Sequence, residues 1–118
     1  MANPSTTGPS GAGTEVLRRR TIEAGSAAET ILTVGANHIF TIMNIIILNN
    51  DTHAETMDIF TSTDGSGSIY MVKNQAIGDR ETFVFSDKFV MTATDVLSTW
   101  CSSSDYDVHV SYIDQEFA

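Results

Sequence analysis

The stretch HIFTIMNIIILNN, residues 38–50, decides the fold of this chain. It is apolar in both of its alternating sets of side chains and rich in β-branched residues, which fit a pleated strand better than a helix. Turn-forming residues flank it, with Gly35, Ala36 and Asn37 before it and Asn49-Asn50-Asp51 after it. The pattern therefore predicts a central strand that is buried on both faces, and it disfavours the rival interpretation of a helix.

Shorter strand patterns recur on both sides of this segment. They lie at residues 15–22, 29–34, 55–63, 68–73, 81–85, 88–91, 95–101 and 106–112. Turn residues separate them, and Asp64-Gly65-Ser66-Gly67 is typical of a hairpin tip. The last segment alternates most regularly and puts four residues on a buried face: Tyr106, Val108, Val110 and Tyr112.

Eight or nine short strands without a convincing helix predict an all-β fold, an antiparallel β-sandwich or jelly roll. The chain has 118 residues, enough for one domain. We expect the domain to span residues 15–118, because residues 1–14 are Gly, Ser, Thr, Pro and Ala with little else and make an extended arm. The expected core includes five residues from three strands: Ile45, Ile47, Phe83, Val108 and Val110.

The charge of the chain is unevenly placed. The formal net charge is −9, yet Arg18, Arg19 and Arg20 supply three of the six basic residues. An acidic body of this kind repels phosphate backbones, so we expect no nucleic-acid partner. The opening residues have no apolar run, and the longest apolar stretch is far shorter than the roughly 20 residues of a membrane helix, so we expect a soluble chain without a membrane partner.

The sequence offers no constellation for catalysis. His38, His53 and His109 are widely spaced, and Cys101 has no second cysteine, so we expect no metal and no disulfide. Nucleophile-elbow and phosphate-loop motifs are absent, and residues 64–68 lack the carboxylates of a calcium loop. We therefore expect no enzyme, no catalytic residue and no cofactor.

Two features stand out as candidate interface elements. Arg18 and Arg20 share one strand face and Arg19 the other, which fits either a solvated edge that blocks strand addition or a clamp on an acidic neighbour, with phosphate binding a third reading. Residues 39–48 are apolar on both faces, and the second face is covered either by another subunit or by a loop or the arm. The expected interface residues are Arg18, Arg19, Arg20, Ile42 and Ile46.

Several segments together resemble a known group of proteins. These are the arm, IIILNN, SIYMVKNQAIGDRETFVFSDKFVM, DVLSTW and DYDVHVSYIDQ. Over residues 30–115 the chain resembles small β-sandwich structural proteins of tailed bacteriophage virions, of the capsid decoration or cement type. The resemblance carries over no site residues.

The resemblance implies a chain located in the virion and assembled in the host cytoplasm. It implies a homo-oligomer, for example a trimer, that docks on capsomer seams and contacts the major capsid protein or other virion proteins. A tail, baseplate or adaptor subunit is the alternative within this class. A carbohydrate- or receptor-binding module is the alternative outside it and would need exposed aromatic residues, although Tyr70, Trp100, Tyr106 and Tyr112 mostly alternate into core positions.

Overall fold

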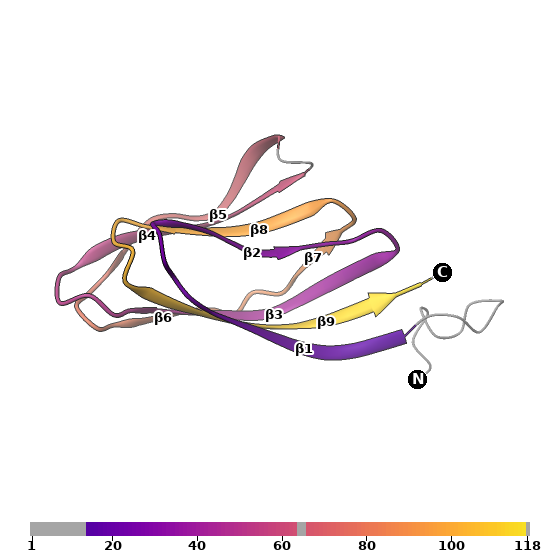
Figure 1. Ribbon diagram of the computed structural model, residues 1–118, viewed down its shortest axis with the longest axis horizontal. Coiled ribbons are helices and arrows are strands. Elements are labelled where there is room, and N and C mark those ends of the chain that lie inside the picture. The colour runs from indigo at the N-terminus through magenta and orange to yellow at the C-terminus, as the bar shows by residue number, and fades with distance from the viewer. Residues whose placement is uncertain (1–13, 64–65, 118) are drawn as a thin grey trace.

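The computed structural model describes residues 14–63 and 66–117, which form two antiparallel β-sheets packed face to face (Figure 1). The strands in chain order are β1 (Thr14–Glu23), β2 (Ala28–Thr33), β3 (His38–Asn49), β4 (Glu55–Thr63), β5 (Ser66–Ile77), β6 (Thr82–Phe85), β7 (Phe89–Thr92), β8 (Asp95–Cys101) and β9 (Tyr106–Glu116). The described residues contain no helix. The predicted antiparallel β-sandwich is confirmed, while residues 1–13 of the expected arm and Asp64-Gly65 of the expected hairpin tip lie outside the described residues.

The two sheets differ in their strand order. The five-stranded sheet has the order β1-β9-β3-β6, and β7 pairs with β3 next to β6 along the same edge. The four-stranded sheet has the order β2-β8-β4-β5. β3 is therefore central, as predicted, and β1 forms the other edge of the five-stranded sheet, where it pairs with β9 alone in the described structure.

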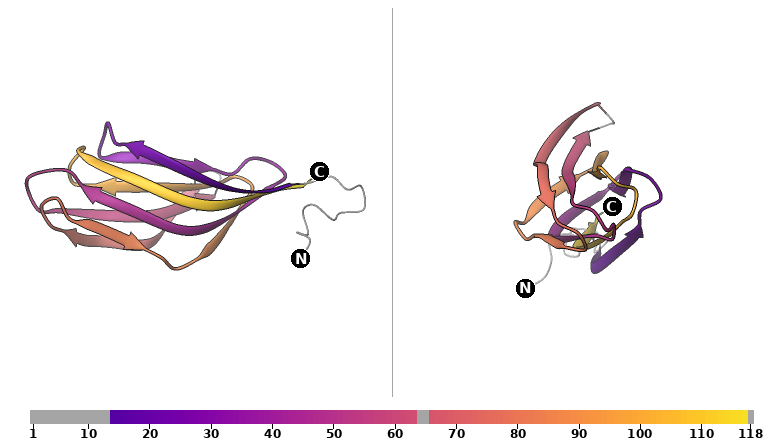
Figure 2. Two further views of the ribbon diagram at one scale, coloured as in Figure 1. Left: turned by 90° about the horizontal axis from the view of Figure 1, so that it is seen from below. Right: turned by 90° about the vertical axis from the view of Figure 1, so that its left-hand side faces the viewer.

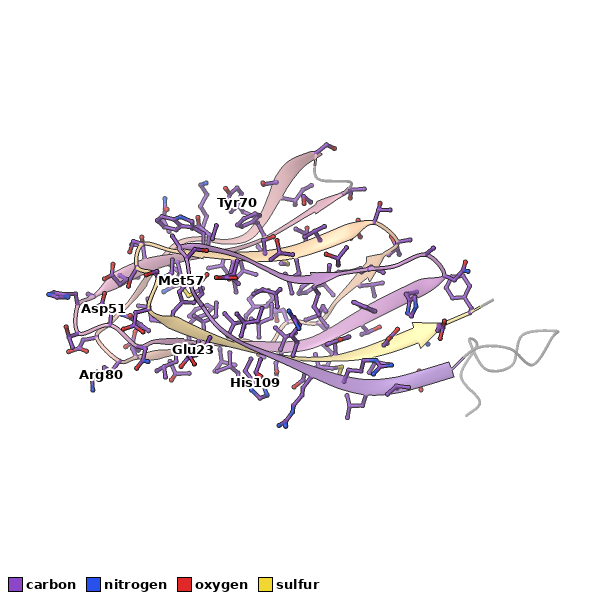
Figure 3. All side chains as sticks on the ribbon, in the orientation of Figure 1. Glu23, Asp51, Met57, Tyr70, Arg80 and His109 are labelled. Carbon is purple, nitrogen blue, oxygen red and sulfur yellow. The ribbon has the colours of Figure 1, made fainter. Side chains whose placement is uncertain are left out.

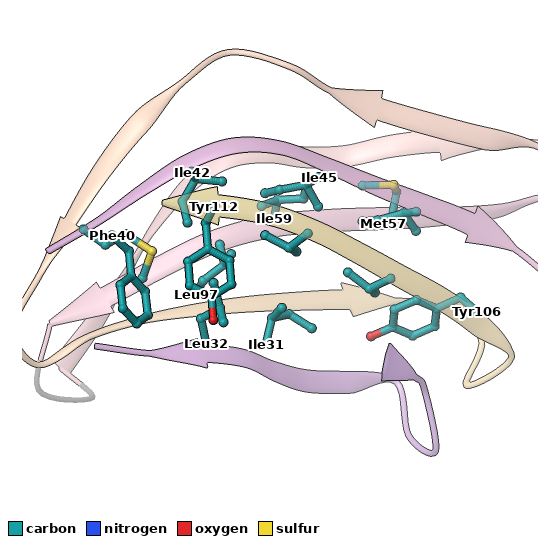
Figure 4. Packing of buried hydrophobic residues seen from close by; sticks show 14 of the residues in the cluster. Ile31, Leu32, Phe40, Ile42, Ile45, Met57, Ile59, Leu97, Tyr106 and Tyr112 are labelled. Carbon is teal, nitrogen blue, oxygen red and sulfur yellow. The ribbon is translucent and has the colours of Figure 1, made fainter. Parts of the chain in front are cut away.

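The core lies between the sheets and is built by simple alternation along the strands (Figure 4). On β9 every second residue from Tyr106 to Asp114 is buried. β8 contributes Leu97 and Cys101 from the opposite sheet. The predicted core residues Ile45, Ile47, Val108 and Val110 are each at most 2% exposed, whereas Phe83 is half-buried and packs against the rim of the core.

A bulge in β3 changes which of its side chains face the core. The register between β3 and β9 shifts between Ile42 and Asn44, so Met43 is an extra residue on β3. Before the bulge Phe40 and Ile42 face inward, and after it Ile45 and Ile47 do so. A strict period of two cannot describe this strand, because one extra residue reverses the assignment of every later side chain.

Buried polar groups fix the end of the sandwich where β3 ends and β9 begins. Asn49 is fully buried, and its Nδ2 donates to the carbonyl oxygens of His53 at 2.8 Å and Gly78 at 2.9 Å. The Tyr106 hydroxyl donates to the Ala27 carbonyl at 2.9 Å and lies 3.1 Å from Oγ1 of Thr99. Since an unpaired buried polar group is costly, these bonds hold the loops in place against the sheets.

The β4–β5 hairpin projects beyond the rest of the sandwich (Figure 2). The register between β4 and β5 shifts at several points, the first between Met57 and Ile59. At the corresponding bulge in β5, Asn74 adopts a left-handed backbone conformation with φ 53°. The carboxylate of Asp58 accepts the backbone N–H of Asn74 at 2.7 Å and so satisfies a donor that the bulge takes out of the ladder.

Candidate functional site

The outer face of the five-stranded sheet divides into a charged half and an uncharged half. Alternation and register place nine residues of β3, β6 and β7 on this face, and none of them is charged. We call these residues the uncharged half-face: Ile39, Thr41, Asn44, Ile46, Leu48, Thr82, Val84, Val90 and Thr92. An outward sheet face of a soluble domain is ordinarily polar and charged, so this composition marks a surface suited to being covered.

Large aliphatic side chains of this face lie open to solvent. Val84 is 53% exposed and Val90 60% exposed, and Leu17 on the neighbouring β1 is 72% exposed. Ile46 and Ile113 are half-buried between them. Scattered exposed aliphatic residues are normal on a protein surface, but here they occupy all the strands of one sheet face.

Charged residues flank this surface on one side, along β9 and β1. The outward side chains of β1 include Glu15, Arg19 and Glu23, and those of β9 include Asp107 and His109. His109 and Glu23 project from the five-stranded sheet away from the core (Figure 3). Protein–protein interfaces commonly combine an apolar core with polar and charged residues at its border.

A shallow hollow of about 320 Å³ lies where the uncharged half-face meets the charged half. Ile46 and Leu48 line it from β3, and Thr21, Glu23 and His109 line it from β1 and β9. It is wide open to solvent and has an apolar wall, so it suits a projecting aliphatic side chain better than a charged small molecule.

The three expected interface arginines have different roles. Arg18 and Arg20 lie on the inward side of β1, and Arg19 lies on its outward side, as the sequence predicts. The Nε of Arg18 donates to Oδ2 of Asp114 at 2.9 Å, and the Nε of Arg20 donates to the Ile31 carbonyl at 2.7 Å. Both bonds lie within the chain, so Arg19 alone of the three points its side chain at the outer face.

Ile42 and Ile46 were expected to contact a neighbour, and the bulge separates them. Ile46 faces outward on the uncharged half-face, but Ile42 is 0% exposed and faces the core. Ile42 therefore has no surface to offer a partner, which corrects that part of the expectation. The residues that sequence reasoning missed are Val84 and Val90, whose alternation with Phe83, Phe85 and Phe89 could have indicated them.

Titratable groups cluster mainly at Asp114, which is buried and ties β1 to β3. Nδ1 of His38 lies 2.7 Å from Oδ1 of Asp114, and Nε2 of His38 lies 3.7 Å from Oε2 of Glu116. Together with the bond from Arg18, these contacts form a structural ion-pair network at the end of the sandwich. Two open hollows, of about 480 Å³ and 400 Å³, adjoin Arg18 on the β1 side of this network.

The described residues 14–63 and 66–117 hold no group of histidine, cysteine and acidic side chains placed to bind a metal ion. Cys101 is buried, and burial raises the pKa of its thiol, which keeps it protonated and unreactive. The same residues form no helix long and apolar enough to cross a membrane.

A carbohydrate-binding module would need exposed aromatic residues, and the tyrosines of this chain are divided between core and surface. Tyr106 and Tyr112 are buried, while Tyr70 is 41% exposed on the outer side of the four-stranded sheet. Its ring packs against Phe60 with 5.1 Å between centroids, and Nζ of Lys73 lies 3.7 Å from its centroid. Tyr70 is thus packed by its own neighbours and presents no flat open face of the kind that sugar stacking uses.

No family model matches the chain, and no curated protein matches it. Solved structures match it by shape. The chain is similar to a protein chain in the crystal structure of the T13 particle of infectious bursal disease virus. The TM-score is 0.54 and the identity 7%, over 87% of this chain and 31% of the virus chain. It is similar to the core of Drosophila NLP, a structure described for pentamer formation and histone binding, with TM-score 0.51 and 15% identity over 83% of this chain and 96% of that chain.

A third similar structure is VP2 of the infectious bursal disease virus subviral particle, with TM-score 0.50 and 10% identity over 89% of this chain and 33% of that chain. The chain spans about a third of the length of these virus chains. At such identities the likeness shows the fold alone. The fold is a two-sheet antiparallel β-sandwich of a kind that occurs in virus particles.

Proposed function

We propose that this chain is a structural component of a virus particle, of the capsid decoration type, and that it acts by assembly and not by chemistry. The observation that carries the proposal is the uncharged half-face, an aliphatic surface on a rigid sheet in a chain with formal net charge −9. Burial of apolar surface between subunits is the dominant favourable term in such assemblies.

The sandwich supports this role through its rigidity. Both sheets share one continuous core, and buried hydrogen bonds of Asn49 and Tyr106 tie the loops to the strands. Such a domain can bring many weak contacts to a particle without reorganising, and many copies on one particle add avidity.

Residues 1–20 are the proposed attachment element. Residues 1–14 are mostly small and polar, and the basic run of β1 begins four residues later, at Arg18. Arg18 and Arg20 are engaged within the domain, which leaves Arg19 as the basic group offered to an acidic partner. Charge-assisted contacts of this kind add specificity to an interface whose affinity comes mainly from buried apolar surface.

The negative charge of the domain is compatible with a protein partner and unfavourable for binding nucleic acid. From residue 21 onward three basic residues stand against fourteen acidic ones. A surface of this sign repels a packaged genome and so favours a position on the outside of a shell. A tail or baseplate position is the alternative within the same class, and the experiment below separates the two.

The test is rebinding to particles. Particles from the culture that produces the chain are stripped of it with mild denaturant, and purified full-length protein is added back. The proposal predicts co-sedimentation that saturates at many copies per particle, on isolated heads as well as on whole particles. Binding to isolated tails alone would identify the protein as a tail or baseplate subunit. If the protein co-sediments with no particle fraction, the proposal is wrong.

A further inference from the structure

We propose that two copies of this chain pack face to face through the outer side of the five-stranded sheet, with a two-fold axis parallel to the strands. The inference rests on the surface of the domain and does not depend on a role in a virion. It names the occupant of the uncharged half-face as a second copy, and it fixes which side chains meet.

Register arranges the outer face in rows that cross the strands. One row contains Leu17, Ile113, Thr41 and Val90. The next row contains Arg19, Ser111 and Asn44, and ends at the link of residues 86–88 between β6 and β7.

The third row contains Thr21, His109, Ile46 and Val84. The two rows with aliphatic residues thus lie on either side of a polar row.

The proposed two-fold axis runs along the strands, above the line between β9 and β3. It lays each row of one copy on the same row of the second copy in reverse order, so that β1 faces β6 and β7, and β9 faces β3. It places Leu17, 72% exposed, on Val90 of the second copy, 60% exposed. It also places Val84 of the second copy over Thr21 and His109, at the hollow that Ile46 helps to line. The most exposed aliphatic side chains of the face are therefore buried against each other or in the hollow.

The polar row is complementary to itself under the same operation. Arg19 comes to the link of the second copy, which carries the exposed Asp87 together with Lys88. Ser111 comes to Asn44, a half-buried polar residue of the same outer face. Each copy thus offers a cation and a hydroxyl where the other offers a carboxylate and an amide.

An axis perpendicular to the strands lacks this complementarity. It would lay β1 on β1, with Arg19 near Arg19 and Glu15 near Glu23 of the second copy, and like charges at an interface are repulsive. Both axes keep the strand directions of the two sheets aligned, as in sandwich packing, so the charge pattern distinguishes them.

The face is large enough to hold a dimer. The face is four strand positions wide, at about 4.8 Å per strand, and about ten residues long, at roughly 3.3 Å per residue. Its area is therefore on the order of 600 Å² in each copy. Two such faces bury on the order of 1,200 Å², the lower limit of standard stable interfaces. Under the parallel axis the uncharged half-face of each copy lies over β1 and β9 of the other, so the acidic side chains in the rows of one copy meet uncharged side chains of the second.

The first test is sedimentation velocity of the full chain at a series of concentrations. We expect a monomer–dimer equilibrium, and Val90→Lys and Val84→Lys should each weaken it at least tenfold. The matched control is Ile69→Lys, which alters an aliphatic residue 71% exposed on β5 of the other sheet and should leave the dimer intact. Far-UV circular dichroism checks that every variant is folded. A wild-type chain that stays monomeric at millimolar concentration overturns the proposal.

The second test is a charge swap between copies. Arg19→Asp and Asp87→Arg should each weaken the dimer, and the double variant should recover most of the lost affinity, because the pairing is restored across the axis. Lys88→Ala should change little. Additive losses in the double variant would contradict this geometry even if a dimer forms, and equal sensitivity of the dimer to Ile69→Lys would place the interface on another surface.

Discussion

Arg18 and Asp114 join the edge strand β1 to the interior of the sandwich. The Nε of Arg18 lies 2.9 Å from Oδ2 of Asp114, whose side chain is only 9% exposed, while the Arg18 side chain is 50% exposed. The other carboxylate oxygen of Asp114 lies 2.7 Å from Nδ1 of His38. A carboxylate so far out of water needs its donors, because an unpaired buried charge is strongly unfavourable.

Arg18→Ala should lower the free energy of unfolding by about 1 kcal/mol, since the bond is charge-assisted but the arginine is half exposed. Arg19→Ala is the matched control in the same strand and should change it little. Urea denaturation at one low protein concentration, where the chain is monomeric, measures both. Equal stability of the two variants would contradict the role given to Asp114.

Ile47→Ala should cost about 2–5 kcal/mol of unfolding free energy, because Ile47 is 1% exposed and its truncation leaves a cavity between the sheets. Ile69→Ala removes the same atoms from an exposed position of β5 and should cost under about 0.5 kcal/mol. Chemical denaturation compares the two. A loss below about 0.5 kcal/mol for Ile47→Ala would mean that the register of β3 is wrong.

Tyr106 should make the fold sensitive to alkaline pH. Burial raises its pKa to about 12 from an ordinary value of 10.0, and the Thr99 hydroxyl opposes this shift only in part. The folded state holds this proton more tightly than the unfolded state. Stability from this group is therefore complete below about pH 10 and is lost as the pH rises toward 12.

The Tyr106→Phe variant tests this linkage. It should reduce the slope of unfolding free energy against pH between pH 10 and 12, and it should be less stable than the wild type at pH 7 by about 1 kcal/mol through loss of the bond to Ala27. Tyr70→Phe, at an exposed position, is the control. An unchanged slope in Tyr106→Phe would show that another group governs the alkaline loss.

Deletion of residues 1–13 should separate attachment from folding. Every residue of the described core lies beyond this segment, so the thermal midpoint should change little. Attachment to stripped particles should weaken, and Arg19→Glu should weaken it further. Substituting all three arginines would be a poor test, because Arg18 and Arg20 bond within the domain and their loss would destabilise it. Unchanged attachment in both variants would leave residues 1–13 without a role in assembly.

Much of the fold could be predicted from local pattern. The alternation of β9 and the β-branched run of β3 each fix a strand and its buried face through side-chain period alone. The Met43 bulge could not be predicted this way, because it depends on how β3 pairs with β9 across the sheet. A period of two carried through Met43 puts Ile42 on the same face as Ile46, whereas the structure buries Ile42.

The candidate surface was predictable in kind and at Ile46, and alternation can indicate that Val84 and Val90 share a face, but not which strands they lie beside. The two apolar faces of residues 39–48 indicate that something covers the outer side of the sheet. The contributions of Val84, Val90 and Leu17 depend on which strands become neighbours of β3 and β9, and the bonds from Arg18 to Asp114 and from Arg20 to Ile31 join residues far apart in sequence. Such pairings arise from topology, which residue spacing does not reveal.

The central claim is that this chain is a structural part of a virus particle, and an electron cryo-microscopy map of the intact particle tests it most directly. We predict density for the two-sheet sandwich at many symmetry-related positions on the outside of the shell, lost from particles that lack the chain. A particle map without such density, with the protein recovered only in the soluble fraction of the lysate, would contradict the claim.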